Sequence, residues 1–212
     1  MRKKKNFIPR WDRVSNYLVM NAAALRGEWR GLFPEAAALH VELGCGKGGF
    51  LAASARVHPD TLFIGMERSP EALLMAMEKA ISEELANLFF VCGDAVLLDT
   101  FFASDEVDML FINFCDPWPS RKRARRRLTY RDYLFRCQKV LKPGCPLRFK
   151  TDDASLFAFT LKELFATGAQ VVFQSCDWHH DPEYPGDDHM TEYETRFSAL
   201  GVPIRRLEAV WR

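Results

Sequence analysis

LHVELGCGKGGFLAASARVH, from Leu39 to His58, joins a short apolar run to a glycine-rich turn and then to a segment that ends before Pro59. The first five residues are typical of a buried strand, and the segment from Gly48 has the apolar spacing of a helix. Glycines let the backbone turn sharply and let a ligand approach the N-terminus of the following helix. The stretch therefore predicts a strand, turn and helix of an α/β protein.

Six further apolar runs continue this pattern along the chain. They cover residues 61–67, 88–94, 108–116, 146–152, 170–177 and 203–211, and helical patterns at 69–85, 129–144 and 153–168 lie between several of them. Continuously apolar strands with helices long enough to cross over are typical of a parallel sheet buried on both faces. The expected fold is a doubly wound α/β fold, with a mostly parallel seven-stranded sheet and helices on both faces.

Two of the expected helices carry signals at their N-termini. Ser69 suits the N-cap of the first helix, and Pro70 suits its first turn. Thr129 and Asp132 have capping-box spacing at the second, whose inward face would hold Tyr130, Leu134, Cys137 and Leu141. Residues 1–38 do not fit this alternation. They are expected to form a basic N-terminal arm with one short helix around 14–25, ahead of a domain of residues 39–212.

The composition is that of an ordinary globular domain, because 48% of the 212 residues are hydrophobic, 27% are charged and the net charge is +1. Six cysteines occur without a Cys-x-x-Cys pair, which argues against a zinc ribbon or a disulfide framework. No apolar run is long enough for a membrane span, and no apolar region follows the basic N-terminus as in a signal peptide. A cytoplasmic monomer or homodimer is expected, with no membrane contact and no obligatory protein partner evident.

An acidic residue stands at or beside four consecutive strand ends: Glu42, Glu67, Asp94 and Asp116. In such a sheet, ligands bind beyond the carboxyl ends of the strands. The glycine turn matches G-x-G-x-x-G, and Glu67 follows Gly44 by 23 residues, where an acid can accept hydrogen bonds from ribose hydroxyls. NAD and S-adenosylmethionine both fit these two features. Glu42 suits a cationic amino-acid group and Asp94 an adenine amine, which favours S-adenosylmethionine, although both could be merely solvated acids.

The segment DPWP, Asp116 to Pro119, follows the fourth expected strand. It resembles the acid-Pro-Pro-aromatic signature of methyltransferases that act on nitrogen in planar bases. The prolines make a rigid elbow, and Trp118 offers a stacking surface, whereas the simpler interpretation is a turn with a packed tryptophan. Seven cations without an intervening acid follow between Arg121 and Arg131, which favours contact with phosphates over a solvated face.

With these motifs, the chain resembles the bacterial tRNA (guanine-N7)-methyltransferases over nearly its whole length. The resemblance rests on VELGCGKGGF, FIGMERS, GDA, INFCDPWPSRKRARRRLTY, FKTD and TEYETRFSALGVPI. It implies a methyltransferase domain at residues 39–212 with a class I fold, S-adenosylmethionine as cofactor, and methylation of a guanine in the variable loop of tRNA. It also implies that Asp116 is catalytic and that the cofactor side comprises Glu42, Gly44, Gly46, Glu67, Asp94 and Asp116.

The same resemblance implies a substrate side and an RNA surface. The substrate side would comprise Ser120, Asp152, Thr191, Glu192, Tyr193 and Glu194, and the RNA surface Arg121, Lys122, Arg123, Arg125, Arg126 and Arg127. Ser120 departs from the family, which usually has a lysine after DPWP. Either Arg121 replaces that cation, or Ser120 keeps a hydrogen-bonding role. The terminal RKKK, Arg2 to Lys5, either adds a grip on RNA or is a basic tail.

Several alternatives remain at this point. Thr191 and Glu194 also have capping-box spacing and could simply begin a helix. His179, His180, Asp187, Asp188 and His189 could suggest a metal site, but without convergent spacing they are expected to lie in a flexible polar loop, and no metal is expected. An NAD-dependent oxidoreductase, a non-catalytic RNA-binding protein and another base N-methyltransferase are the competing functions.

Overall fold

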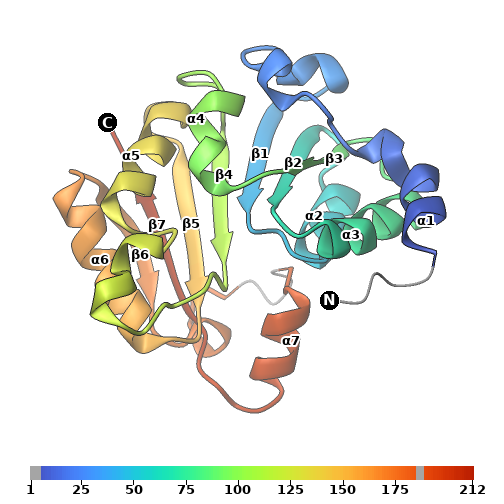
Figure 1. Cartoon of the computed structure of the whole chain (residues 1–212). Helices are drawn as coiled ribbons and strands as arrows, with labels where there is room; N and C mark the ends of the chain where they lie inside the picture. The colour runs from blue at the N-terminus through green and yellow to red at the C-terminus, as the bar shows by residue number, and fades with distance from the viewer. Residues whose placement is uncertain (1–5, 185–188) are drawn as a thin grey trace.

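The sheet of this computed structural model, which describes residues 6–184 and 189–212, has seven strands in the order β3-β2-β1-β4-β5-β7-β6 (Figure 1). The first five strands in this order pair in parallel, and β7 runs antiparallel to β5 and β6. The bounds are β1 Ala38–Leu43, β2 Thr61–Glu67, β3 Leu88–Cys92, β4 Met109–Asn113, β5 Pro146–Thr151, β6 Gln170–Ser175 and β7 Arg205–Val210. The expected mostly parallel seven-stranded sheet is confirmed.

Helices cover both faces of the sheet, as expected. The α-helices are α1 Phe7–Val14, α2 Gly49–Val57, α3 Pro70–Ser82, α4 Leu98–Phe101, α5 Arg131–Val140, α6 Ala154–Ala166 and α7 Glu192–Ser198. One buried cluster packs α1, α2 and α3 against the sheet, and the other packs α4, α5 and α6 (Figure 1). Adjacent strand residues enter different clusters: Leu110 and Ile112 face one and Phe111 the other. This is why the strands are apolar throughout.

The N-terminal segment differs from the expected helix around 14–25. The α-helix ends at Val14, and residues 15–17 and 22–25 form only 3₁₀ turns. Between these turns Leu18 bridges to Phe90 of β3, and the Val19 N–H donates to the Phe90 carbonyl at 2.8 Å. Pairing with the edge strand therefore interrupts helix formation. The basic residues Arg2 to Lys5 lie outside the described residues.

One of the two expected helix caps is confirmed. The Ser69 hydroxyl accepts from the Ala72 N–H at the start of α3, with Pro70 in the first turn. The capping box at Thr129 and Asp132 was wrong. Thr129 is fully buried with its hydroxyl 2.8 Å from that of Thr160, and the carboxylate of Glu163 on α6 accepts from the Arg131 N–H instead. The start of α5 is therefore fixed by a contact with α6 and not by a capping box of its own.

Asn87 joins the turn after α2 to the sheet from a buried position. Its amide nitrogen lies within 3.0 Å of the carbonyl oxygens of Ala55, His58 and Thr61. A buried carbonyl that loses its donor keeps its desolvation penalty. The side chain therefore fixes the connection that leads from α2 into β2.

We expect Asn87→Ala to lower the free energy of unfolding by about 2 kcal/mol, because it leaves buried carbonyls without a donor. Urea denaturation measures this loss. Asn21→Ala is the matched control, since Asn21 is exposed and its side chain caps no turn. Equal stability of the two variants would contradict this role.

Candidate active site

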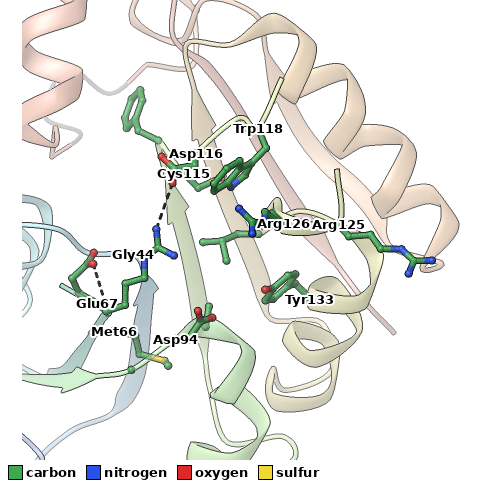
Figure 2. A pocket seen from close by; sticks show the side chains of 15 residues that line it. Gly44, Met66, Glu67, Asp94, Cys115, Asp116, Trp118, Arg125, Arg126 and Tyr133 are labelled. Atoms are coloured by element: carbon green, nitrogen blue, oxygen red, sulfur yellow. Dashed lines mark hydrogen bonds and ion pairs between the residues drawn. The ribbon is translucent and has the colours of Figure 1, made fainter. Parts of the chain in front are cut away.

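A cavity of about 770 Å³ opens at the carboxyl edge of the sheet, where β1 and β4 lie side by side (Figure 2). The strand order reverses at this point, which is where doubly wound folds bind ligands. Four of the six residues expected on the cofactor side line the cavity: Gly44, Glu67, Asp94 and Asp116. The volume falls in the range of small-molecule sites. The fold therefore brings together residues that are up to 72 positions apart.

The glycine turn between β1 and α2 needs its glycines for two physical reasons. Gly44, Gly46 and Gly48 all have positive φ, at 78°, 55° and 71°. At Gly48 a Cβ would also lie 2.8 Å from the Cβ of Ala76, so α3 leaves no space for a side chain. The turn is therefore fixed by backbone conformation and by helix packing.

Glu67 ends β2 and ties the glycine turn to this strand. Its carboxylate accepts from the N–H groups of Gly46 at 3.1 Å, Arg68 at 2.9 Å and Ser69 at 2.9 Å. Asp94 lies after β3 and accepts from the Val96 N–H at 3.0 Å. Both carboxylates are held by backbone donors while they line the cavity, so their orientation is set before any ligand arrives.

Glu42 is the penultimate residue of β1, two positions before the glycine turn, and is only 2% exposed. Asn113, the last residue of β4, donates to one carboxylate oxygen at 2.8 Å. The other oxygen, Oε2, is buried without a hydrogen-bond partner among the described residues. Burial raises the pKa of Glu42 to about 8, although the hydrogen bond from Asn113 acts in the opposite direction. One oxygen of the Glu42 carboxyl group is thus buried and without a hydrogen-bond partner among the described residues.

Asp116 and Trp118 lie on a strained loop after β4. Phe114 and Trp118 have positive φ angles of 51° and 40°, a conformation that side chains with a Cβ seldom adopt. The Asp116 side chain is 70% exposed, and its carboxylate lies 3.9 Å from the Arg68 guanidinium. Figure 2 shows Asp116 and Trp118 at the rim of the cavity, with Glu67 on the side opposite the indole. Strain of this kind gathers at functional sites.

The cations after this loop form a 3₁₀ helix over Arg121–Arg126. Five of them are exposed: Arg121, Lys122, Arg123, Arg125 and Arg126. The guanidinium of Arg126 lies 4.9 Å from the centre of the Trp118 indole, and that of Arg123 lies 5.8 Å from it. Ser120 is the exposed N-cap of this helix, and its side chain makes no cap hydrogen bond. These exposed side chains form a positive surface next to the cavity.

Arg127 differs from the other five cations expected on the RNA surface, because it is only 8% exposed. Its guanidinium donates to the carbonyls of Pro117 and Trp118 and lies 4.2 Å from the ring centre of Phe159. The loop and an aromatic ring therefore enclose this guanidinium.

The residues expected on the substrate side do not all lie together in the structure. Asp152 and Tyr193 lie together, with 3.3 Å between the hydroxyl and a carboxylate oxygen. The Tyr193 ring centre is 5.0 Å from that of Phe114, which lines the cavity. These two residues therefore stand next to the candidate site.

Thr191 and Glu194, also expected on the substrate side, have a structural role in the fold. Thr191 and Glu194 form a capping box that begins α7, as the simpler interpretation proposed. Glu194 has no exposed side-chain surface, and its carboxylate lies 3.2 Å from the Lys150 ammonium and 3.1 Å from His179. Glu194 thus joins β5 and residue 179 to the start of α7, and its expected contact with the substrate stays a prediction.

Glu192, also expected on the substrate side, lies next to Gly49 at the N-terminus of α2. A Cβ at Gly49 would stand 2.4 Å from its carboxylate carbon. Lys79 on α3 pairs with it at 2.5 Å and lowers the pKa of Glu192 although burial opposes this. The first residue of α7 is therefore fixed above the N-terminus of α2.

Residues 178–180 also differ from the expected polar loop. Trp178, His179 and His180 form a 3₁₀ turn in which Trp178 is buried against Phe173 and Arg206. Asp187 and Asp188 lie outside the described residues. Within residues 6–184 and 189–212, no three His, Cys, Asp or Glu side chains are grouped so that they could hold a metal ion.

Sequence reasoning did not identify Asn113, Arg68 or Lys150. Asn113 and Lys150 look like interior residues of apolar strands, and Arg68 is a lone cation in a turn. A polar residue in a buried strand needs a polar partner, so the signal was the residue type itself.

None of the helices in the part of the chain that the structure describes is long and apolar enough to cross a lipid bilayer.

The sequence matches a protein-family profile with the description "Putative methyltransferase" over residues 36–207. It is 39% identical to the tRNA (guanine-N(7)-)-methyltransferase of Limosilactobacillus fermentum, over 99% of this chain and 97% of that one. It is 41% identical to the enzyme of the same name from Geobacillus kaustophilus, over 92% of this chain and 88% of that one.

Two solved structures support the fold alone. A structure described as an antibiotic related methyltransferase aligns with a TM-score of 0.65 at 19% identity, over 86% of this chain and 92% of that one. The 16S rRNA methyltransferase KamB aligns with a TM-score of 0.66 at 16% identity, over 88% of this chain and 94% of that one.

The buried carboxyl of Glu42 gives a pH-dependent stability. Because its pKa in the folded state is about 8, above the ordinary value of 4.5, its contribution is present in full below pH 4.5 and is lost as pH rises through 8. We expect the melting temperature of the ligand-free protein to fall between pH 5 and pH 9, and Glu42→Gln to flatten that fall. Thermal melts at several pH values test this. Glu71→Gln, at an exposed site, should keep the wild-type slope; equal slopes in both variants would contradict the assignment.

Proposed function

Because the chain belongs to the family of tRNA (guanine-N(7)-)-methyltransferases, we propose that it transfers a methyl group from S-adenosylmethionine to N7 of a guanine in the variable loop of tRNA. The observation that carries the residue assignments is the cavity that Asp116 lines together with Glu67 and Asp94. Residues 39–212 would form the catalytic domain. With tRNA as the substrate, we expect the enzyme to act in the cytoplasm as a monomer or homodimer.

The residues around the cavity fit S-adenosylmethionine. Glu42 has one buried oxygen without a hydrogen-bond partner among the described residues, and its carboxyl group would give up its proton to pair with the cofactor's ammonium group. Glu67 ends β2 where the ribose hydroxyls would lie, and Asp94 follows β3 where the adenine would lie. When bound, the cofactor supplies an electrophilic methyl group on a sulfonium. The glycine turn would let the backbone approach the ligand closely.

Methylation at guanine N7 does not require the protein to remove a proton first. N7 carries an in-plane lone pair and no proton, so no base is needed before attack. The positive charge that develops on the purine must instead be stabilised, and the ring must be aligned. Alignment and charge are therefore the tasks of the side chains at the rim.

We assign both tasks to Asp116, with Asp152 as its neighbour. Guanine N1–H and N2–H are adjacent donors, and a carboxylate can accept from both. Asp116 lies at the rim and is largely exposed, so it can meet a base that is turned out of the RNA. Asp152 and Tyr193 border the same site, and because Glu194 is fully buried we propose Asp152 as the residue that assists Asp116. Glu194 instead holds Lys150 and the start of α7.

The exposed cations of residues 121–126 would bind the phosphates of the tRNA backbone. They lie along one short 3₁₀ helix whose last turn is in contact with Trp118. Phosphates bound along this helix would bring the target nucleotide to the cavity. The acceptor guanine in the variable loop follows from the family resemblance, and its location remains a prediction.

Methylation of an unmodified tRNA transcript tests the function directly. The transcript is incubated with the protein and a labelled methyl donor, and its nucleosides are then analysed. We expect a single labelled product, 7-methylguanosine, from the variable loop. Label in another nucleoside would favour a different base methyltransferase, and absence of label would contradict the proposal.

Asp116→Asn should lower kcat for methyl transfer by about two orders of magnitude, because it removes the charge that offsets the methylated purine. The affinity for tRNA should change little, since the cations remain. Steady-state kinetics and filter binding measure the two quantities. Asp132→Asn, at an exposed position on α5, is the matched control. Unchanged kcat in Asp116→Asn would remove this residue from the mechanism.

Replacing Arg125 and Arg126 together by alanine should weaken tRNA binding and make it less sensitive to salt. The slope of log Kd against log salt concentration should become shallower by roughly one for each phosphate contact that is lost. A double replacement at Arg13 and Arg56, which are exposed cations outside this helix, should leave the slope unchanged. If the two double variants have the same slope, the cations of residues 121–126 do not contact phosphates.

A further inference from the structure

Arg127 differs from the other cations of its segment in what surrounds it. The five cations at residues 121–126 are exposed, whereas Arg127 is 8% exposed. Its guanidinium lies 4.2 Å from the ring centre of Phe159 on α6, a face-on contact between a cation and an aromatic ring. The side chain is therefore part of the protein interior next to the site.

Its hydrogen bonds go to the loop that carries Asp116. The Nε atom donates to the Pro117 carbonyl at 2.9 Å, and an Nη atom donates to the Trp118 carbonyl at 3.0 Å. One guanidinium thus spans two consecutive carbonyls, which its planar fork of donors can do and an ammonium cannot. These two carbonyls belong to the elbow directly after Asp116.

The elbow needs such a support. Trp118 has a φ of 40°, and a strained residue of this kind persists only when its surroundings hold it. Pro117 and Pro119 have no N–H groups, so the loop itself has few donors with which to fix its shape. The donors must come from elsewhere, and Arg127 supplies two of them.

Arg127 is in turn anchored to a rigid part of the fold. Its own N–H donates to the Ala124 carbonyl, and its carbonyl accepts from the Tyr130 N–H just before α5. Phe159 belongs to α6, and the carboxylate of Glu163 on the same helix binds Arg131 at 2.9 Å. The loop is thus connected through one guanidinium to two packed helices.

We propose that Arg127 is a positioning residue for methyl transfer, which holds the elbow at Pro117 and Trp118 so that Asp116 and the indole keep their places at the rim of the cavity. It is not an RNA contact, although it lies in the basic tract. The proposal rests on the proposed function of the same site. It divides the tract into exposed cations that bind tRNA and one enclosed cation that orders the loop.

Arg127→Lys tests this inference because it keeps the positive charge and removes the fork. We expect kcat to fall on the order of 100-fold, since a small displacement of an aligned group is costly. The KM for tRNA, the salt slope of tRNA binding and the Kd of S-adenosylhomocysteine should stay within about twofold. A generally destabilised protein would instead lose affinity for both ligands.

Amide hydrogen exchange gives a readout that does not depend on activity. Exchange in peptides that cover residues 113–123 should be faster in Arg127→Lys than in the wild type, with no change at the glycine turn. Wild-type protein that transfers no methyl group to tRNA would refute the proposed function. Wild-type activity together with unchanged kcat and unchanged exchange in Arg127→Lys would refute the positioning role alone.

Two further variants complete the experiment. Phe159→Leu removes the stacking contact while the hydrogen bonds can remain; it should lower kcat in the same direction, and it decides the question if Arg127→Lys does not fold. Lys162→Met, at an exposed site one turn along α6, should leave all quantities unchanged. If Arg127→Lys weakens tRNA binding and makes its salt slope shallower at unchanged kcat, Arg127 is a phosphate contact and the proposal is wrong.

Discussion

Parallel pairing of β1 with both β2 and β4 is the constraint on which the site depends. The register places Glu42 between Gly65 of β2 and Phe111 of β4, so the ends of the three strands reach the same edge. The hydrogen bond from Asn113 to Glu42 joins the two strands where the order reverses. Each acid is then oriented by the strand that precedes it, and the cavity follows from the sheet.

The acidic residues at this edge of the sheet differ in burial and in hydrogen bonding, although all carry carboxyl groups. Glu42 is buried and one of its oxygens has no hydrogen-bond partner among the described residues. The Glu67 carboxylate accepts three backbone hydrogen bonds, and Asp116 is exposed to solvent. Three carboxylates near one cavity thus have three different environments. A cationic ligand would gain most at the buried group, and an exposed base edge can be met only by the open one.

Helix α7 connects the two sides of the site. Its first three residues make three different contacts. Glu192 pairs with Lys79 of α3, the Tyr193 hydroxyl contacts the Asp152 carboxylate, and Glu194 is buried against Lys150 of β5. Consecutive side chains of a helix point about 100° apart, so a short motif can contact three elements. Figure 1 shows α7 below the carboxyl edge of the sheet, between α3 and β5.

The sequence by itself determined the alternation of strands and helices, the strand-end acids and the glycine turn, because local periodicity and turn chemistry are written in short stretches. It did not determine the end of α1 at Val14, the start of α5 or the surroundings of Glu194 and Arg127. Those depend on partners such as Phe90, Glu163, Lys150 and Phe159, which are far away in the chain. Whether an arginine in a basic tract is exposed or enclosed is decided by packing, and only the tertiary structure sets that.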